Sequence, residues 1–312
     1  MKRIVICIVS YNQERVIGRT LESILNQKDW GLFRIIVSDD CSKDRTWDIL
    51  QEYKEKYPEI LDIHRNDHNL GIYGNVAQSN TYLPSDYDLV CDLAGDDALC
   101  DGYFKALQEF IRKKNIDTSK AVGIYSDWKA VSPDGIEKVM TQEKAISGIN
   151  LWSLKIRDKI CGRSLMTTKS VRDQYEPILR GKGLSLTETH YDSQPHLNIT
   201  KAFYLPFIAS VYYTGIGVST KLADKRKSDY YTVQSAETWN YCMNHIATST
   251  YDKHYINYRL LLATFYSEPS LKILLRMFHH YVKGQLPNDK ESVKHTIILF
   301  LRFFFYMFKK KN

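Results

Sequence analysis

The sequence lacks closely spaced cysteines. None of its six cysteines forms a C-x-x-C pair, the spacing typical of metal and redox sites. Several lie in apolar runs, where a free thiol acts as a small hydrophobic side chain. They are Cys7, Cys41, Cys91, Cys100, Cys161 and Cys242. This pattern predicts a reduced, cytoplasmic protein.

The sequence also lacks an apolar run long enough to span a membrane. Residues 296–308, "TIILFLRFFFYMF", number thirteen and contain an Arg, whereas a spanning helix needs about 20 apolar residues. The opening "MKRIVICIVSYN" has too short an apolar stretch for a signal peptide and continues directly into a strand pattern. We therefore expect the N-terminus to be part of the fold.

The first 271 residues lack a charge imbalance. Residues 272–312 contain nine Lys and Arg and two Asp and Glu, which accounts for the whole net charge of +7. A nucleic-acid-binding domain usually carries a basic surface across the folded domain. The charge placement therefore argues against that class and predicts a basic tail with its own partner.

What is present is a globular composition, 44% hydrophobic and 25% charged. Strand and helix patterns alternate through residue 131, as in a parallel α/β sheet. The predicted strands are 3–10, 33–40, 60–66, 87–94 and 121–131, and the predicted helices are 14–26, 43–57, 71–83 and 102–114. Residues 201–213 form a last predicted strand, and only helical periodicity follows residue 229.

Polar residues follow four of these strands. They are Ser10, Tyr11 and Asn12, then Asp39 and Asp40, then Asn66 and Asp67, then Asp96 and Asp97. In open α/β sheets ligands bind beyond the carboxyl ends of the strands. Helix capping explains any one cluster equally well, but the occurrence of all four together argues against capping alone. The sequence predicts one acidic, hydrogen-bonding cleft.

The adjacent carboxylates of Asp96 and Asp97 repel each other unless a cation offsets their charge. Oxygen ligands suit Mg²⁺ or Mn²⁺, which typically take one or two carboxylates and complete their shell with phosphate oxygens and water. The sequence has neither G-x-x-x-x-G-K-[ST] nor a G-x-G-x-x-G after the first strand. We expect a nucleotide diphosphate held by metal rather than by a glycine loop.

Four segments carry a resemblance to a known family: "IVSYNQERVIGRTLESILNQ", "VSDDCSKDRTWDIL", "NLGIYGNV" and "DLAGDDAL". In order and spacing they resemble the motifs of inverting family 2 glycosyltransferases of the GT-A fold, over residues 1–115 and more loosely to about 220. The resemblance implies a Rossmann-like α/β fold with a mixed sheet flanked by helices. Residues 1–115 would bind the nucleotide sugar, 116–220 would face the acceptor, and 221–312 would form a helical C-terminal extension.

The resemblance also implies roles for single residues. Tyr11 would face the uracil, and Asp40, supported by Asp39, would hydrogen-bond its edge. Asp97 would bind Mn²⁺ or Mg²⁺, and Asp96 the ribose or the metal. The remaining residues of the implied nucleotide-sugar site are Ser10, Asn12, Glu14, Asn69 and Gly71.

The chain departs from the family pattern at several positions. Ala94 stands where many members carry the first Asp of the metal motif, and Asp92 lies too early to replace it. Cys41 and Arg45 stand where glycine is usual. The metal site would therefore depend on Asp96 and Asp97 alone, with no third protein ligand assigned.

An inverting transferase needs a base that removes the proton of the acceptor hydroxyl. The family's base lies at the start of a helix before a "Y-[IL]-P" strand, and "YLP" at 204–206 places Glu188 there. Asp192, one helical turn on, and His190 are the alternatives; Glu188 also suits the first turn of a helix without any catalytic role. In "CGRSLMTTKSV", Arg163 or Lys169 is either a diphosphate ligand or a surface charge.

The basic, aromatic C-terminal tail, together with "LKILLRMFHHYVKG" (271–284) before it, fits helices that lie in a membrane interface, with Lys and Arg toward anionic headgroups. The alternative is a terminal helix that packs on the domain or forms a dimer. With this tail, the sequence predicts a metal-dependent inverting glycosyltransferase on the cytoplasmic face of a membrane. It would move a sugar from a nucleotide-diphosphate donor, expected to be UDP-linked, to a polysaccharide or lipid-linked glycan. The alternatives are a catalytically inactive nucleotide-sugar-binding module at a membrane and a sugar nucleotidyltransferase.

Overall fold

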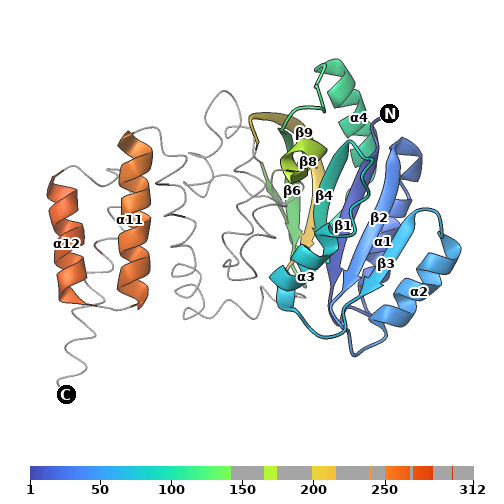
Figure 1. Cartoon of the computed structure of the whole chain (residues 1–312), viewed down its shortest axis with the longest axis horizontal. Helices are drawn as coiled ribbons and strands as arrows, with labels where there is room; N and C mark the ends of the chain where they lie inside the picture. Colours follow the sequence, from blue (N-terminus) through green and yellow to red (C-terminus); the bar gives the residue numbers. More distant parts are fainter. Residues whose placement is uncertain are drawn as a thin grey trace. The chain divides into compact units, whose positions relative to one another are not determined.

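The computed structural model describes residues 1–141, 165–173, 199–215, 250–267 and 270–283, together with residues 239, 243 and 297. These residues fall into two compact units. The first contains the described residues up to 215, drawn in blue to yellow in Figure 1, and the second contains those from 239 onward.

The first unit contains four parallel strands in the order β3-β2-β1-β4. Their bounds are Ile4–Ser10 (β1), Leu32–Asp39 (β2), Leu61–Arg65 (β3) and Leu89–Ala94 (β4). The helices between them are α1 (Ile17–Leu25), α2 (Thr46–Lys56) and α3 (Gly71–Asn80), and α4 (Tyr103–Lys113) follows β4. A 3-10 helix, η1, spans Lys28–Trp30. The predicted parallel α/β pattern is confirmed.

The remaining strands make the sheet mixed. The long strands β6 (Val122–Val131) and β9 (Lys201–Tyr213) are parallel to each other. The three-residue strand β8 (Met166–Thr168) lies between β4 and β6 and is antiparallel to both. Two short strands complete the sheet: β5 (Ala98–Leu99) pairs with β9, and β7 (Glu137–Met140) pairs with β6. This is the predicted mixed sheet with flanking helices.

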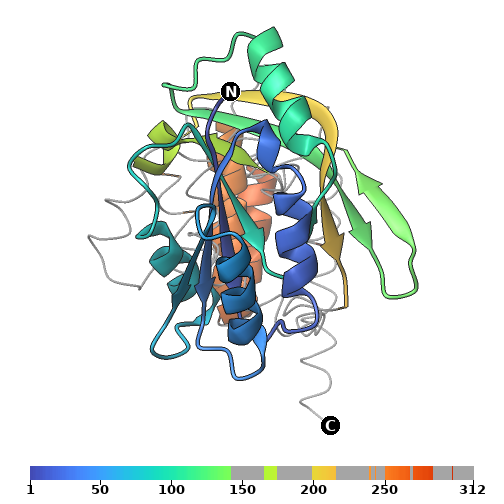
Figure 2. The same cartoon turned by 90° about the vertical axis from the view of Figure 1, so that its right-hand side faces the viewer.

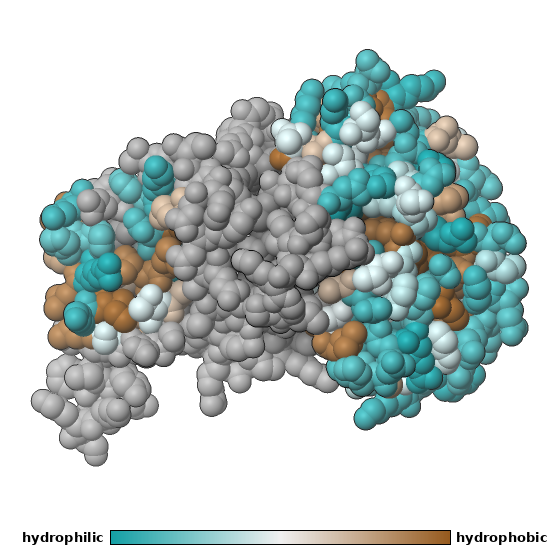
Figure 3. Space-filling model, in the orientation of Figure 1, coloured by the Kyte–Doolittle hydropathy of each residue, from teal (hydrophilic) through white to brown (hydrophobic). Residues whose placement is uncertain are grey.

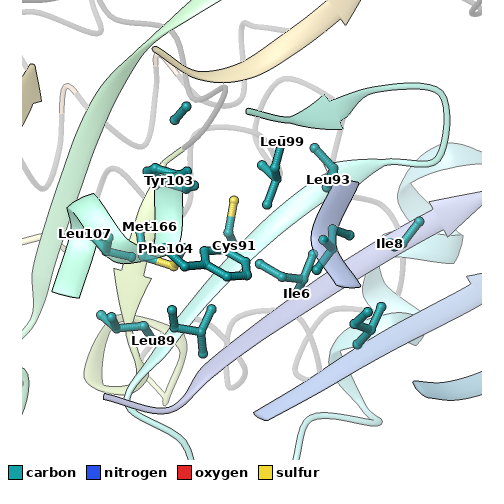
Figure 4. Packing of buried hydrophobic residues seen from close by; sticks show 14 of the residues in the cluster. Ile6, Ile8, Leu89, Cys91, Leu93, Leu99, Tyr103, Phe104, Leu107 and Met166 are labelled. Atoms are coloured by element: carbon teal, nitrogen blue, oxygen red, sulfur yellow. The ribbon is translucent and has the colours of Figure 1, made fainter. Parts of the chain in front are cut away.

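Strand alternation assigns each face of the sheet its own core. Ile4, Ile6 and Ile8 of β1 belong to the large cluster that includes the buried residues of α1 and α4. Val5 and Cys7 point to the other face, in a separate cluster. Figure 2 shows α1 and α2, in blue, in front of the strands. Figure 4 shows side chains of β1, β4 and β8 meeting those of α4 in the large cluster.

The structure corrects several predicted bounds. The first helix, predicted from Glu14, begins at Ile17, because the backbone N–H groups of Gln13 and Glu14 donate to Thr46 and Asp44 at the start of α2. The fourth strand begins at Leu89 rather than at residue 87. The last strand, 201–213, has its predicted bounds.

In the second unit, α11 (Thr250–Ser267) packs against α12 (Leu271–Val282). Their contact is a cluster of Tyr258, Leu262, Phe265, Leu274 and Met277. This part of the predicted C-terminal region is helical, as expected. Within the residues that the structure describes, no helix is long and apolar enough to cross a membrane.

Candidate functional site

The polar strand ends converge at one edge of the sheet. Ser10, the last residue of β1, pairs with Asp39 on one side, and Val9 pairs with Ala94 on the other. Asp39 and Asp40 therefore flank the end of β1 on one side, and Asp96 and Asp97 flank it on the other. The register brings together the two carboxylate pairs that the sequence places 57 residues apart.

Asp39 is fully buried and ties three segments together. Its carboxylate accepts hydrogen bonds from the hydroxyl of Ser10 at 3.2 Å and from the backbone N–H of Ser42 at 3.0 Å, and also from the Ser42 hydroxyl. Arg65 Nε lies 3.5 Å from the same carboxylate. A buried carboxylate held by this many donors is fixed in one orientation.

Asp40 is 2% exposed and belongs to a buried polar network. Its Oδ1 accepts from the backbone N–H of Leu70 at 2.7 Å and from the side chain of Asn66 at 3.0 Å. Asn66 also donates to Asn75, which in turn donates to the carbonyl of Ser38 at 2.9 Å. The network fixes the loop after β3 against the carboxyl end of β2.

The loops after β1 and β2 are joined by reciprocal hydrogen bonds. The Asn12 side chain accepts from the backbone N–H of Lys43 at 2.8 Å, and the Glu14 carboxylate accepts from that of Arg45 at 3.0 Å. In return, the Ser42 hydroxyl accepts from the Asn12 N–H at 2.9 Å. Asn12 and Glu14 therefore order the loop, and their contact with a nucleotide stays a prediction.

Asp44 caps the start of α2. Its carboxylate accepts from the backbone N–H groups of Glu14 and Thr46 and from the Thr46 hydroxyl. Desolvation by burial alone would raise the pKa of Asp44, but the hydrogen bonds outweigh it and hold the pKa below the ordinary 3.8.

Cys41, between the two carboxylates and this cap, has a φ of +60°. The left-handed region is unfavourable for a residue with a Cβ atom and is readily adopted by glycine. The loop therefore keeps the backbone conformation that a glycine would suit, although the chain carries cysteine there. Cys41 and the other described cysteines (Cys7, Cys91 and Cys100) are free.

Asn69, Gly71 and Tyr11 lie on exposed parts of the same edge. Asn69 Oδ1 accepts from the Gly71 N–H at 3.0 Å, and Gly71 has a φ of +74° at the start of α3. Tyr11 is 40% exposed. All three are accessible to a ligand at the carboxyl ends of β1 and β3.

The segment after β4, residues 95–97, is held in place by hydrogen bonds to side chains of α1. Asp96 and Asp97 are 9% and 6% exposed. The Thr20 hydroxyl lies 2.8 Å from the carbonyl oxygen of Gly95 and 2.6 Å from that of Asp97, and Arg19 donates to the carbonyl of Asp96 at 2.7 Å. The backbones of residues 95–97 are therefore fixed by two neighbouring helix residues.

Gly95 permits this close approach. A Cβ atom at this position would lie 2.2 Å from the side-chain oxygen of Gln13 and 3.1 Å from the carbonyl of Val9. The Gly95 N–H donates to that carbonyl at 3.0 Å. The glycine lets the chain turn across the end of β1, so that Asp96 and Asp97 follow directly at the carboxyl end of β4.

Arg19 also connects this segment to the end of β9. Its guanidinium carbon lies 3.5 Å from the centre of the Tyr213 ring, a cation–π contact. Arg19 and Thr20 were not predicted as site residues. The available signal was Thr20 itself, a polar residue on the apolar face of α1 beside Ile17, Leu21 and Ile24.

Asp92, set aside in the sequence, has a separate partner. Its carboxylate pairs with the buried guanidinium of Arg172. Lys169 lies at the amino end of β4, where its N–H donates to the Asp88 carbonyl and its Nζ lies 2.6 Å from Asp173. The pairing favours the surface-charge alternative for Lys169. Arg163 lies outside the described residues.

The metal prediction concerns Asp96 and Asp97 alone. Over the described residues, no group of three or more His, Cys, Asp and Glu could hold a metal ion. Two adjacent carboxylates at the carboxyl end of the sheet nevertheless fit Mg²⁺ or Mn²⁺, which complete their shell with phosphate oxygens and water. The predicted base Glu188 and its alternatives Asp192 and His190 lie outside the described residues.

Comparison with solved structures shows the fold of this chain. S. aureus TarS residues 1–349 in complex with UDP-GlcNAc superposes with a TM-score of 0.61 at 15% identity, covering 86% of this chain and 77% of that 1–349 chain. The mannosyltransferase PcManGT of Pyrobaculum calidifontis, in complex with GDP-Man and Mn²⁺, gives 0.51 at 13% identity, covering 96% and 84%. The fold is that of GT-A glycosyltransferases.

Two curated relatives each match about a third of the chain. The processive diacylglycerol beta-glycosyltransferase of Mycoplasma pneumoniae is 30% identical over 118 residues, 37% of this chain and 34% of the relative. The abequosyltransferase RfbV of Salmonella typhimurium is 32% identical over 107 residues, 34% of this chain and 31% of the relative.

The alignments span between 22% and 34% of the curated relatives' lengths. The model of the family "Glycosyl transferase family 2" matches residues 5–174, which is more than half of the chain. The match includes the ends of β1, β2 and β4 and both carboxylate pairs. This chain belongs to glycosyl transferase family 2.

Proposed function

We propose that this protein is a metal-dependent inverting glycosyltransferase that uses a nucleotide-diphosphate sugar. The observation that carries the proposal is the sheet register, which places two buried carboxylate pairs on either side of the end of β1. One pair suits a nucleotide base and the other suits a metal-bound diphosphate. The family membership supports the transfer of a sugar.

In this proposal the nucleotide base lies over the joined loops after β1 and β2. Tyr11 stacks on the base, and Asp40 accepts from its edge. The hydrogen bonds described above hold this pocket in shape, and they are made by Asp39, Ser10, Asn12 and Glu14. Asn69 and Gly71 border it. The donor is proposed to be UDP-linked, which the complex of TarS with UDP-GlcNAc supports by analogy.

Asp97, with Asp96, would hold Mn²⁺ or Mg²⁺. Such a metal offsets the negative charge that the departing diphosphate gains. Arg19 and Thr20 keep the two carboxylates in position through the backbone. Glu188 is proposed as the base that takes the proton of the acceptor hydroxyl, with Asp192 as the alternative. In-line attack on the face opposite the nucleotide inverts the anomeric centre.

The acceptor is proposed to be a polysaccharide or a lipid-linked glycan. The support is analogy: the relatives include a diacylglycerol glycosyltransferase and an abequosyltransferase. A cytoplasmic protein would meet a lipid-linked acceptor at a membrane surface. The basic aromatic tail, residues 296–312, is proposed to contact anionic lipid there; Ile297, its described residue, is 54% exposed.

The substitution Asp97→Asn tests the proposal. It removes one charge from the carboxylate pair at nearly constant volume, so Mn²⁺-dependent binding of UDP, measured by calorimetry, should be lost. Asp101→Asn, at an exposed Asp on the same segment, is the matched control and should bind UDP as the unchanged protein does.

Two results would contradict the proposal. If Asp97→Asn kept the same metal dependence, the metal assignment would be wrong. If the unchanged protein bound a donor tightly but released no UDP from any sugar nucleotide, the inactive binding module would replace the enzyme.

A further inference from the structure

Helix α12 has more apolar surface than its helix partner covers. Leu274 and Met277 are fully buried in the cluster shared with α11. Four other apolar side chains of α12 stay largely exposed: Leu271 at 46%, Leu275 at 54%, Phe278 at 54% and Val282 at 68%. We call these four residues the α12 stripe.

The α12 stripe is a continuous surface. Its residues are spaced four, three and four apart, so at about 100° per residue they lie within an arc of about 60°. The arc adjoins the side of α12 that faces α11. Figure 3 shows apolar surface gathered over the α11–α12 hairpin. Single exposed apolar side chains are ordinary, but a contiguous row of four marks an interaction surface.

The charges beside the stripe all have one sign. Residues 271–283 contain no Asp or Glu, but they contain Lys272, Arg276 and Lys283. On a helical projection these three lie beyond the stripe, on the side away from Leu274 and Met277. The exposed surface therefore runs from apolar to basic across α12.

This arrangement selects among possible partners. Two copies of the chain that paired their stripes would bring like charges together, which opposes association. A membrane with anionic lipids instead offers apolar acyl chains to the stripe and negative headgroups to the bordering lysines. We infer that the α12 stripe docks on an anionic lipid surface, with α12 lying in the plane of the interface.

The inference refines the membrane contact of the proposed function and rests on it, but not on the identity of the donor or acceptor. It assigns the contact to described residues of α12 rather than to the tail, residues 296–312, alone. Lys272 and Lys283 contribute through charge, and the four stripe residues contribute through buried apolar area.

The test is co-sedimentation of the full chain with vesicles of phosphatidylcholine, with and without phosphatidylglycerol. The unchanged protein should bind the anionic vesicles and not the neutral ones. The double variant Leu275→Glu, Phe278→Glu should bind at least about tenfold more weakly, because it puts two charges into the apolar contact. Lys272→Gln with Lys283→Gln should also weaken binding, by about fivefold for each positive charge removed.

Val139→Glu is the matched control, since Val139 is 48% exposed on β7 in the first unit. It should leave vesicle binding unchanged. Circular dichroism and Mn²⁺-dependent UDP binding should be unchanged in all variants, because each altered side chain is exposed and none is a residue of the proposed sugar-transfer site.

Full vesicle binding by the Leu275→Glu, Phe278→Glu variant would overturn the assignment to α12 and leave the tail as the contact. No binding of the unchanged protein to anionic vesicles would overturn both membrane proposals, while UDP binding would still test the transferase separately. A dimer of the unchanged protein that this double variant dissociates, with vesicle binding intact, would assign the stripe to self-association.

Discussion

Thr20 offers a clean test of how the segment after β4 is held. Its side chain is fully buried. Its hydroxyl lies within hydrogen-bond distance of two carbonyl oxygens, those of Gly95 and Asp97. Thr20→Val keeps the shape of the side chain and removes the hydroxyl. Thr20→Ser keeps the hydroxyl and removes a methyl group.

The two substitutions should lower the free energy of unfolding for different reasons. A hydroxyl has one hydrogen, so the two carbonyls share a single donor. Losing it leaves buried carbonyl oxygen without that donor, and Thr20→Val should lower the free energy of unfolding by about 1–3 kcal/mol. Thr20→Ser should lower it by about 0.8 kcal/mol, the value of one buried methyl group.

The two variants should also differ in their affinity for UDP in the presence of Mn²⁺. Thr20→Val releases the backbone at Asp97, and a loss of about 1 kcal/mol in positioning weakens binding about fivefold. Calorimetric titration with UDP and Mn²⁺ measures this directly, and urea unfolding measures the stability. Equal UDP affinity in Thr20→Val and Thr20→Ser would show that the hydroxyl does not position the carboxylates.

Three further changes test other parts of the site. Cys41→Gly should raise the free energy of unfolding by about 0.5–1 kcal/mol, because glycine adopts the left-handed backbone without steric cost; a lower urea midpoint would refute this. Glu188→Gln should keep UDP-sugar binding and lose transfer, and if Asp192→Asn alone does so, Asp192 is the base. The stability contributed by Asp44, whose pKa is lowered by folding, is present above its unfolded pKa and is lost as the pH falls through the folded value. Asp44→Asn should therefore flatten the acid limb of an unfolding-versus-pH profile, and an unchanged limb would contradict the role of its hydrogen bonds.

The sequence predicts the long strands well, because each is a continuous apolar run or a clear alternation. β1 and β9 were found almost to the residue. The two-residue β5 and the three-residue β8 are too short to show a period. They exist because β4 and β9 offer open edges, which is information from distant parts of the chain.

The candidate site, too, is predicted from the sequence only in part. Strand ends predict that Asp39, Asp40, Asp96 and Asp97 gather, because parallel strands end at one edge. Which of their carboxylate oxygens already accept hydrogen bonds depends on donors that lie far away in the sequence. The Asp40 carboxylate accepts hydrogen bonds from Leu70 and Asn66, and the Asn12 side chain accepts one from the loop after β2. No local pattern encodes these contacts.

The place of β8 has a consequence for how the chain becomes folded during synthesis. The strands β1 to β4 can pair as soon as residue 94 is made, but the outer edge of β4 stays bare until residues 166–168 arrive. β5 has its pairing partner only once β9 has been made. An unpaired edge invites pairing with other chains. A fragment that stops at residue 141 would keep that edge open, and only a piece that runs through residue 213 contains every described strand of this sheet.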